Sequence, residues 1–145
     1  MPMSTSSLVP MDEIEDTLEL LDDWEDRYRY IIELGRNLPE MPVGTKTDAT
    51  KVRGCSSQVW LFARNDNAAQ PMELYGDSDA HIVRGLVAIL LALYQGKTPA
   101  DAAKTDARAA LEKLALAEHL SPTRTNGLFS MIERIEQLAT EKAAA

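Results

Sequence analysis

The chain contains one cysteine, Cys55, which is the strongest nucleophile that the sequence offers. Lys51, Arg53 and Gly54 precede it, and Ser56 follows it. A cysteine attacks as its thiolate, and nearby cations favour the thiolate, while a glycine lets the backbone turn tightly beside the sulfur. We therefore expect a thiol that acts as a nucleophile or a carrier, with its pKa lowered by Lys51 and Arg53.

Three apolar residues, Val59, Trp60 and Leu61, follow the cysteine within a predicted strand. A persulfide on Cys55 would gain from apolar walls, because its outer sulfur is readily lost to reductants and oxidants. Burial also raises the pKa of a thiol, so a shielded cysteine needs cations or backbone N–H groups nearby to stay reactive. These two demands predict a pocketed sulfur that becomes exposed when a partner docks.

Other interpretations of the cysteine remain open at this point. Most lone cysteines in folded proteins are simply small buried apolar residues. A Cys–His pair for thiol catalysis requires that the fold bring His81 or His119 to the sulfur. A zinc site built from these three residues is disfavoured, because they lie far apart without closely spaced ligand pairs. One cysteine also excludes an internal disulfide, and it cannot supply the roughly four thiolates of an iron–sulfur cluster.

Length, charge and hydropathy limit the class of protein. The 145 residues, 45% of them hydrophobic, fit one domain, and the net charge of −8 argues against nucleic-acid binding and favours a partner with basic patches. Residues 1–10 lack the features of a signal peptide and are expected to form a mobile arm. The longest apolar run, residues 86–94, is far shorter than the roughly 20 residues that cross a bilayer. We expect a cytoplasmic protein.

Hydrophobic spacing predicts two N-terminal helices. Apolar residues recur at helical intervals over residues 11–21, with acidic residues crowded into the first turn. Asp22 or Asp23 is expected to cap a second helix, which ends before Pro39. A polar loop is then expected over residues 41–50.

The middle of the chain changes to strand-like composition. Residues 52–64 are rich in β-branched and aromatic types, residues 65–70 resemble a turn, and a second strand is expected over residues 72–75. Gly76 is expected to break that strand. These segments predict a small antiparallel hairpin or meander.

Helices are predicted for the rest of the chain. Ser78 or Asp79 is expected to cap a helix that is apolar on most sides and therefore belongs in the core. Further helix starts are expected at Thr98 with Pro99, at Asp106, and at Ser121 with Pro122. The order of elements predicts an α+β domain, with helices packed on a small antiparallel sheet of about three strands.

Four separated segments match a known family in their order and approximate spacing. They are residues 30–35 with 38–39, residues 52–60 around Cys55, residues 76–85, and residues 119–128. On these segments the chain resembles the SufE family of cysteine-desulfuration proteins from about residue 20 to residue 135. The resemblance implies one SufE-like domain over residues 1–145.

The resemblance also implies a function for Cys55. Its thiolate would attack the terminal sulfur of a persulfide on a SufS-type cysteine desulfurase, enhance the turnover of that enzyme, and deliver the sulfur to a SufB-containing scaffold of the SufBCD type. The chain would then be a sulfur-transfer partner, and not an enzyme on its own. It would need no cofactor, because the pyridoxal phosphate is on the desulfurase.

Seven further positions are expected to bind the partner or support the cysteine loop. By resemblance, Asp77 and Asp79 contact the desulfurase or hold this loop, although either Ser78 or Asp79 could instead be a helix cap. Arg124 resembles the family's interface arginine, and a cation in the first turn of a helix does not favour the helix dipole. His119 is expected to be structural. The remaining four positions are Lys51, Arg53, Gly54 and Ser56.

Two alternatives to this function stay open in the sequence. A CsdE-type carrier shares the motif but serves another desulfurase and another acceptor. A non-catalytic module would regulate a desulfurase by docking alone, with Cys55 as a packing residue.

Overall fold

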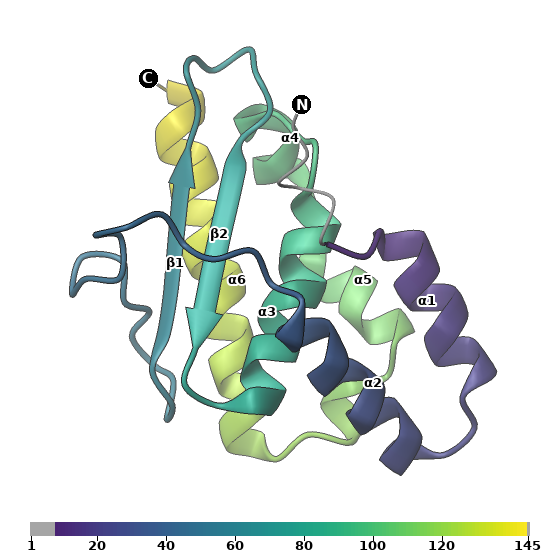
Figure 1. Ribbon diagram of the computed structural model, residues 1–145. Coiled ribbons are helices and arrows are strands. Elements are labelled where there is room, and N and C mark those ends of the chain that lie inside the picture. The colour runs from purple at the N-terminus through teal and green to yellow at the C-terminus, as the bar shows by residue number, and fades with distance from the viewer. Residues whose placement is uncertain (1–7, 145) are drawn as a thin grey trace.

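The computed structural model describes residues 8–144, and these form an α+β fold in which helices cover one face of a small antiparallel sheet (Figure 1). The predicted fold class is confirmed. The elements are α1 (Met11–Leu20), α2 (Trp24–Arg36), β1 (Val59–Arg64), β2 (Glu73–Ser78), α3 (His81–Tyr94), α4 (Pro99–Lys104), α5 (Ala107–Lys113), the 3-10 helix η2 (Leu116–Glu118) and α6 (Pro122–Ala144).

The sheet has two strands in the described residues, and the expectation of about three is wrong. β1 and β2 pair in antiparallel register from Val59 opposite Ser78 to Arg64 opposite Glu73. A third strand is reduced to one bridge between Lys51 and Trp60. It ends there because the N–H of Thr50 turns back to the carbonyl of Thr47 (3.2 Å).

Gly76 lies inside β2, where it pairs with Leu61, and does not break the strand as expected. A Cβ at this position would lie 2.6 Å from Val87 and 2.8 Å from Leu61. The glycine is therefore explained by the close approach of α3 to the sheet, which the sequence around Gly76 does not reveal. The strand consequently runs on to Ser78.

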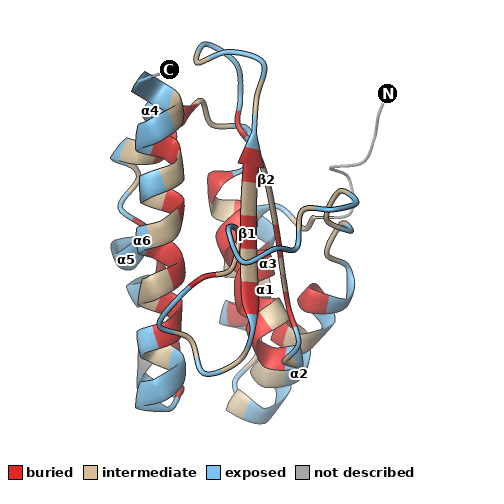
Figure 2. Ribbon diagram, turned by 90° about the vertical axis from the view of Figure 1, so that its left-hand side faces the viewer, coloured by how far each residue is buried: buried red, intermediate tan, exposed pale blue. Residues whose placement is uncertain are grey.

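Helix α3 is the centre of the core and is buried along most of its length (Figure 2). It packs against β2, α2 and α6. The predicted caps of this helix are wrong: it begins after Ala80, which makes no side-chain cap, and Ser78 Oγ instead accepts a hydrogen bond from the Ala80 N–H (3.2 Å).

The other predicted helix starts agree with the structure. Asp23 accepts a hydrogen bond from the Glu25 N–H, and the remaining caps are Thr98, Asp106 and Ser121. In each case the cap lies beside the backbone N–H that it satisfies, so the signal is local.

The expected N-terminal arm lies partly outside the described residues, which begin at Leu8. Leu8 and Val9 pack against the core. In residues 8–144 no helix is both long enough and apolar enough to cross a membrane.

Candidate functional site

Cys55 lies in a loop of residues 53–58, here called the cysteine loop, between the Lys51 bridge and the start of β1. The loop turns at Gly54, whose φ of +91° is a backbone conformation that residues with a side chain rarely adopt. A Cβ on Gly54 would lie 2.5 Å from Ser130 Oγ, so the loop is pressed against α6. The predicted strand over residues 52–64 is thus shortened, because the loop occupies its first half.

The sulfur of Cys55 lies over a small apolar pocket, here called the cysteine pocket. Its Sγ is 3.5 Å from the carbonyl oxygen of Gly127, to which the thiol donates. The cavity has a volume of about 10 Å³, close to the minimum that admits one water-sized sphere. Its lining comes from the cysteine loop and from two helices: Ser56, Ser57, Val83, Leu86, Thr123, Arg124, Gly127 and Met131.

The apolar walls of the pocket are not the ones expected from the sequence. Val59, Trp60 and Leu61 do not line it. Trp60 instead lies on the outer face of the sheet beneath Lys46, whose Nζ is 5.3 Å from the centre of the ring. The loop folds over α3 and α6 before β1 begins, so the walls come from residues distant in sequence.

Burial raises the pKa of the Cys55 thiol above its ordinary value. The expected lowering by Lys51 and Arg53 is not found, because desolvation is the only cause of the shift. Arg53 is exposed to solvent, and the backbone of Lys51 pairs with that of Trp60. In the closed loop, therefore, the protonated thiol is favoured over the thiolate.

Asp79 holds the C-terminal end of the cysteine loop. Its carboxylate accepts a hydrogen bond from the backbone N–H of Gln58 (3.0 Å) and another from the Gln58 side-chain amide (3.4 Å). The backbone N–H of Asp79 also donates to the carbonyl of Gln58 (3.3 Å). Gln58 is thus tied to the end of β2 on both its main chain and its side chain.

Asp77 lies apart from the cysteine loop and ties other segments together. One carboxylate oxygen lies 2.5 Å from Lys46 Nζ, on the segment that crosses the outer face of the sheet. The other lies 2.9 Å from Arg84 Nε on α3, in an ion pair that lacks the alignment of a hydrogen bond. Asp77 therefore fixes the chain that leads to the cysteine loop, without contacting Cys55.

Arg124 and Ser56 line the rim of the cysteine pocket, and both are exposed. The backbone N–H of Arg124 donates to Ser121 Oγ (3.2 Å), which caps α6. In residues 8–144 the Arg124 guanidinium forms no ion pair. A cation is thus presented to solvent beside the sulfur.

Neither histidine lines the cysteine pocket. The His119 ring stacks on Trp24 with ring centroids 3.8 Å apart, and its carbonyl accepts a hydrogen bond from the Tyr28 hydroxyl. His81 is exposed at the start of α3. Residues 8–144 therefore provide no imidazole base for a Cys–His pair at Cys55. No group of three or more His, Cys, Asp or Glu side chains within residues 8–144 is placed to hold a metal ion.

Apart from Ser56 and Arg124, the sequence did not assign the residues that line the cysteine pocket. Val83 and Leu86 come from α3, and Gly127 and Met131 come from α6. One usable signal was Gly127, a glycine inside a helical pattern, which points to close packing. A Cβ there would lie 3.5 Å from the Cys55 sulfur.

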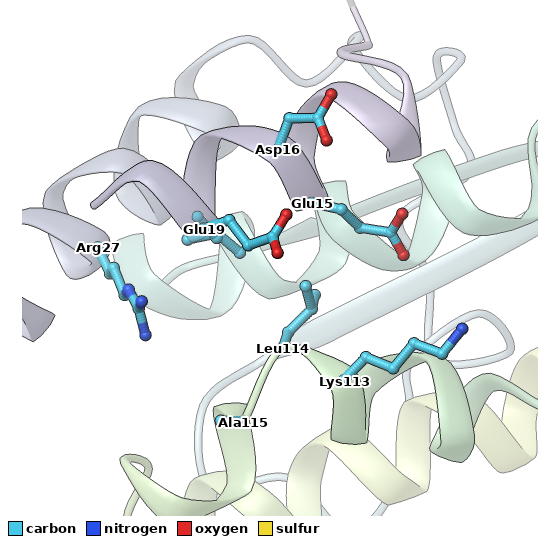
Figure 3. Close-up of a pocket in the computed structure, with 8 residues that line it drawn as sticks. Glu15, Asp16, Glu19, Arg27, Lys113, Leu114 and Ala115 are labelled. Carbon is cyan, nitrogen blue, oxygen red and sulfur yellow. The ribbon is translucent and has the colours of Figure 1, made fainter. Parts of the chain in front are cut away.

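A larger groove of about 320 Å³ lies between α1 and α5 (Figure 3). Glu15, Asp16 and Glu19 line one side, and Lys113 lies on the other. The groove contains no cysteine or histidine, and its acidic side chains are typical of a solvated helix face. The chemistry that the residue types allow is therefore at the smaller pocket around Cys55.

Comparison with known proteins identifies the family of the chain. The family model described as "SufE: Fe-S metabolism associated domain" matches residues 12–139. Uncharacterised SufE-like proteins of Rhizobium meliloti (strain 1021) and Rhizobium etli are each 50% identical to this chain over 140 residues. Each match covers 95% of this chain. It covers 100% of the R. meliloti protein and 95% of the R. etli protein. The solution structure of a hypothetical protein from Thermus thermophilus shares the fold, with a TM-score of 0.76, 18% identity, and coverage of 95% of this chain and 100% of that one. The chain belongs to the SufE family, whose domain is associated with iron–sulfur metabolism.

Proposed function

We propose that this protein carries sulfur on Cys55, from the persulfide of a SufS-type cysteine desulfurase to a SufB-containing scaffold complex. Its SufE domain connects the chain with iron–sulfur metabolism and sulfur transfer. The observation that carries the proposal is that the only cysteine of the sequence lies half-buried over an apolar pocket, with its sulfur hydrogen-bonded to the Gly127 carbonyl.

The transfer is a thiol exchange that needs no external oxidant or reductant. The Cys55 thiolate attacks the terminal sulfur of the desulfurase persulfide and forms a new S–S bond. The S–S bond of the donor breaks, and the desulfurase cysteine leaves as a thiolate. The transferred sulfur keeps its oxidation state, and the proton of Cys55 passes to solvent or to the departing thiolate.

The cysteine pocket protects the sulfur between transfers. Val83, Leu86 and Met131 are buried and apolar, and they exclude water-borne reductants from the side that they cover. The cavity of about 10 Å³ leaves room for about one further atom, which is what a persulfide adds.

Transfer requires that the loop leave this pocket. Burial raises the pKa of Cys55, so the closed loop holds the less reactive thiol. The direct attachments near the sulfur are the Cys55–Gly127 contact and the Asp79–Gln58 hydrogen bonds. Docking of a desulfurase would replace these contacts and move the sulfur into water or into the enzyme's site, where its pKa falls.

Arg124 is positioned to meet the partner. Its exposed guanidinium lies on the rim of the cysteine pocket, on a protein whose net charge is −8. Together with the exposed Arg53 of the cysteine loop, it gives the docking face a positive pattern in an otherwise acidic protein. The pyridoxal phosphate belongs to the desulfurase, and the exchange takes place in the cytoplasm.

Intact-mass measurement tests the proposal. The protein is incubated with a SufS-type desulfurase and cysteine, in parallel with the Cys55→Ser variant, and the desulfurase turnover is followed in the same reactions. The expected result is a gain of one sulfur atom that thiol reductant reverses, with no gain in the variant and a lower turnover. A Cys55→Ser protein that stimulated the enzyme fully would refute sulfur relay and leave docking alone.

A second arm separates the two carrier pathways. The native protein is offered a SufS-type desulfurase and the desulfurase served by a CsdE-type carrier, each at the same concentration, and the loaded protein is then mixed with a SufB-containing complex. Faster loading by the SufS-type enzyme and transfer to the complex support the proposal. Preference for the other enzyme, without transfer to the complex, supports the CsdE-like alternative.

A further inference from the structure

The outer edge of β1 is only half covered by the neighbouring chain. The carbonyl of Val59 and the N–H of Leu61 bond to Val52 (2.7 Å) and Thr50 (2.9 Å) on this side. Backbone groups alternate along a strand, so the N–H and carbonyl of Ala63 point the same way. In residues 8–144 no backbone or side-chain group is bonded to Ala63 on that side. Figure 2 views the molecule from this side, with the upper half of β1 uncovered.

A groove of about 370 Å³ runs beside this open edge. Its floor is apolar, because Leu61 and Ala63 are buried and Leu138 packs against the core. One wall comes from β1 and the other from the C-terminal half of α6. The lining residues are Ala49, Thr50, Leu61, Phe62, Ala63, Arg134, Leu138, Glu141 and Lys142. A backbone with unpaired groups beside apolar space is the arrangement to which an extended peptide adds as a strand.

The charges in the groove favour an acidic occupant. Arg134 and Lys142 line it with Glu141 as the one acidic residue, which leaves one net positive charge in a protein of net charge −8. Neither cation forms an ion pair in the described residues. Arg134 donates to the carbonyl of Ala49 (2.5 Å), but its buried Nε has no acceptor there. A carboxylate in the groove would instead meet the charge of Arg134 and Lys142.

We propose that the open edge of β1 is a docking site for an extended segment of a partner protein that alternates apolar and acidic residues. The segment's backbone pairs with Ala63, its apolar side chains fill the groove over Leu61 and Leu138, and its carboxylates meet Arg134 and Lys142. Pairing between two copies of this chain at this edge is disfavoured, because each copy has the same negative net charge.

This site is separate from the sulfur chemistry. β1 begins beside the cysteine loop, and the groove lies towards its other end at Arg64. None of the residues that line the cysteine pocket lines the groove. A partner bound at the edge would therefore leave Cys55 open to a desulfurase, and the inference does not depend on the proposed function.

The test uses a dye-labelled peptide of alternating valine and glutamate, about seven residues long to match a strand of ordinary length, and fluorescence polarisation with the full chain. The expected result is saturable binding that weakens as salt rises. Ala63→Pro removes the N–H of residue 63 that points outward and leaves the backbone hydrogen bonds between β1 and β2 in place. Proline is tolerated at strand edges. This variant should bind about tenfold more weakly, the loss expected for one backbone hydrogen bond.

Two controls keep the result clear if Ala63→Pro disturbs folding. The first is the same peptide with alternate backbone nitrogens methylated, which removes its donors and should bind the native protein about tenfold more weakly. The second is Lys142→Glu, which should weaken binding and reduce its salt dependence. The inference would be overturned if the native protein did not bind the valine–glutamate peptide. It would also be overturned if the methylated peptide or a valine–lysine peptide bound as tightly as the valine–glutamate peptide, or if sedimentation showed an edge-to-edge dimer. Cys55→Ser should bind the peptide as the native protein does.

Discussion

Replacing Gly127 by alanine should separate the stability of the protein from its capacity to protect sulfur. Gly127 is buried in α6 and faces Cys55. The new methyl group would lie 3.5 Å from Sγ and 3.8 Å from Cα and Cβ of Cys55, which is ordinary van der Waals contact. The substitution therefore causes no clash with the reduced thiol. It does occupy space that an added sulfur would use, because the cavity is only about 10 Å³.

The two effects have opposite signs and measurable sizes. Alanine is favoured over glycine inside a helix by about 1 kcal/mol, which raises Tm by roughly 3 to 4 °C for a chain of this size. An excluded sulfane sulfur loses burial comparable to one methylene, about 0.8 kcal/mol, so its reduction by thiol should be about fourfold faster. The protein should become more stable and its persulfide less so.

The assay loads native and Gly127→Ala proteins with a desulfurase and cysteine, removes the enzyme, and follows loss of one sulfur mass after addition of dithiothreitol. Asn126→Ala is the matched control, since Asn126 is exposed on the same turn of α6 and its replacement also favours the helix. The reasoning is refuted if Gly127→Ala raises Tm but its persulfide survives as long as that of the control. The outer sulfur would then lie elsewhere.

Four further predictions concern the cysteine loop and the core. Gly54→Ala should lower the free energy of unfolding by about 1–3 kcal/mol in urea denaturation, because residue 54 has a φ of +91° and an added Cβ would press on Ser130. Adding Ser130→Gly should recover only the part of this loss that comes from the steric contact. A Gly54→Ala protein as stable as the native one would contradict this reasoning. Asp79→Ala should speed alkylation of Cys55 by iodoacetamide several-fold at a cost of about 1–2 kcal/mol, whereas an unchanged rate would mean that Asp79 does not close the loop. The alkylation rate of native Cys55 should keep rising above the usual thiol pKa of about 8.5, and a plateau below it would contradict the effect of burial. Burial raises the pKa of Tyr94 from 10.0 to about 12, so stability should fall as pH rises through that window; Tyr94→Phe should remove this loss, and parallel pH profiles of the two proteins would argue against it.

Features with local causes could be predicted from the sequence. The sequence predicts helix starts at Asp22 or Asp23, Thr98, Asp106 and Ser121, and in the structure Asp23 and the other three each satisfy an N–H two or three residues away. The fold class followed from the order of helices and strands. Cys55 itself was identified from its residue type and from the segments that resemble the family.

Features that depend on distant packing could not be predicted. Gly76 looks like a strand break, because nothing near it in sequence shows that α3 approaches its Cα. The walls of the cysteine pocket come from α3 and α6, whereas the neighbouring apolar residues were expected to form them. The basic neighbours Lys51 and Arg53 suggested a lowered pKa, yet burial decides its direction. In each case the deciding contact joins elements far apart in the chain.

The walls of the cysteine pocket include the last helix, and this has a consequence for biosynthesis. Cys55 and Gly127 are 72 residues apart. At about 5–20 residues per second, a ribosome adds that length in roughly 4 to 14 s. Late in this interval the thiol has left the ribosome without its cover, so burial has not yet raised its pKa. The nascent chain is therefore more open to oxidation at Cys55 than the finished protein, and completion of α6 ends that exposure.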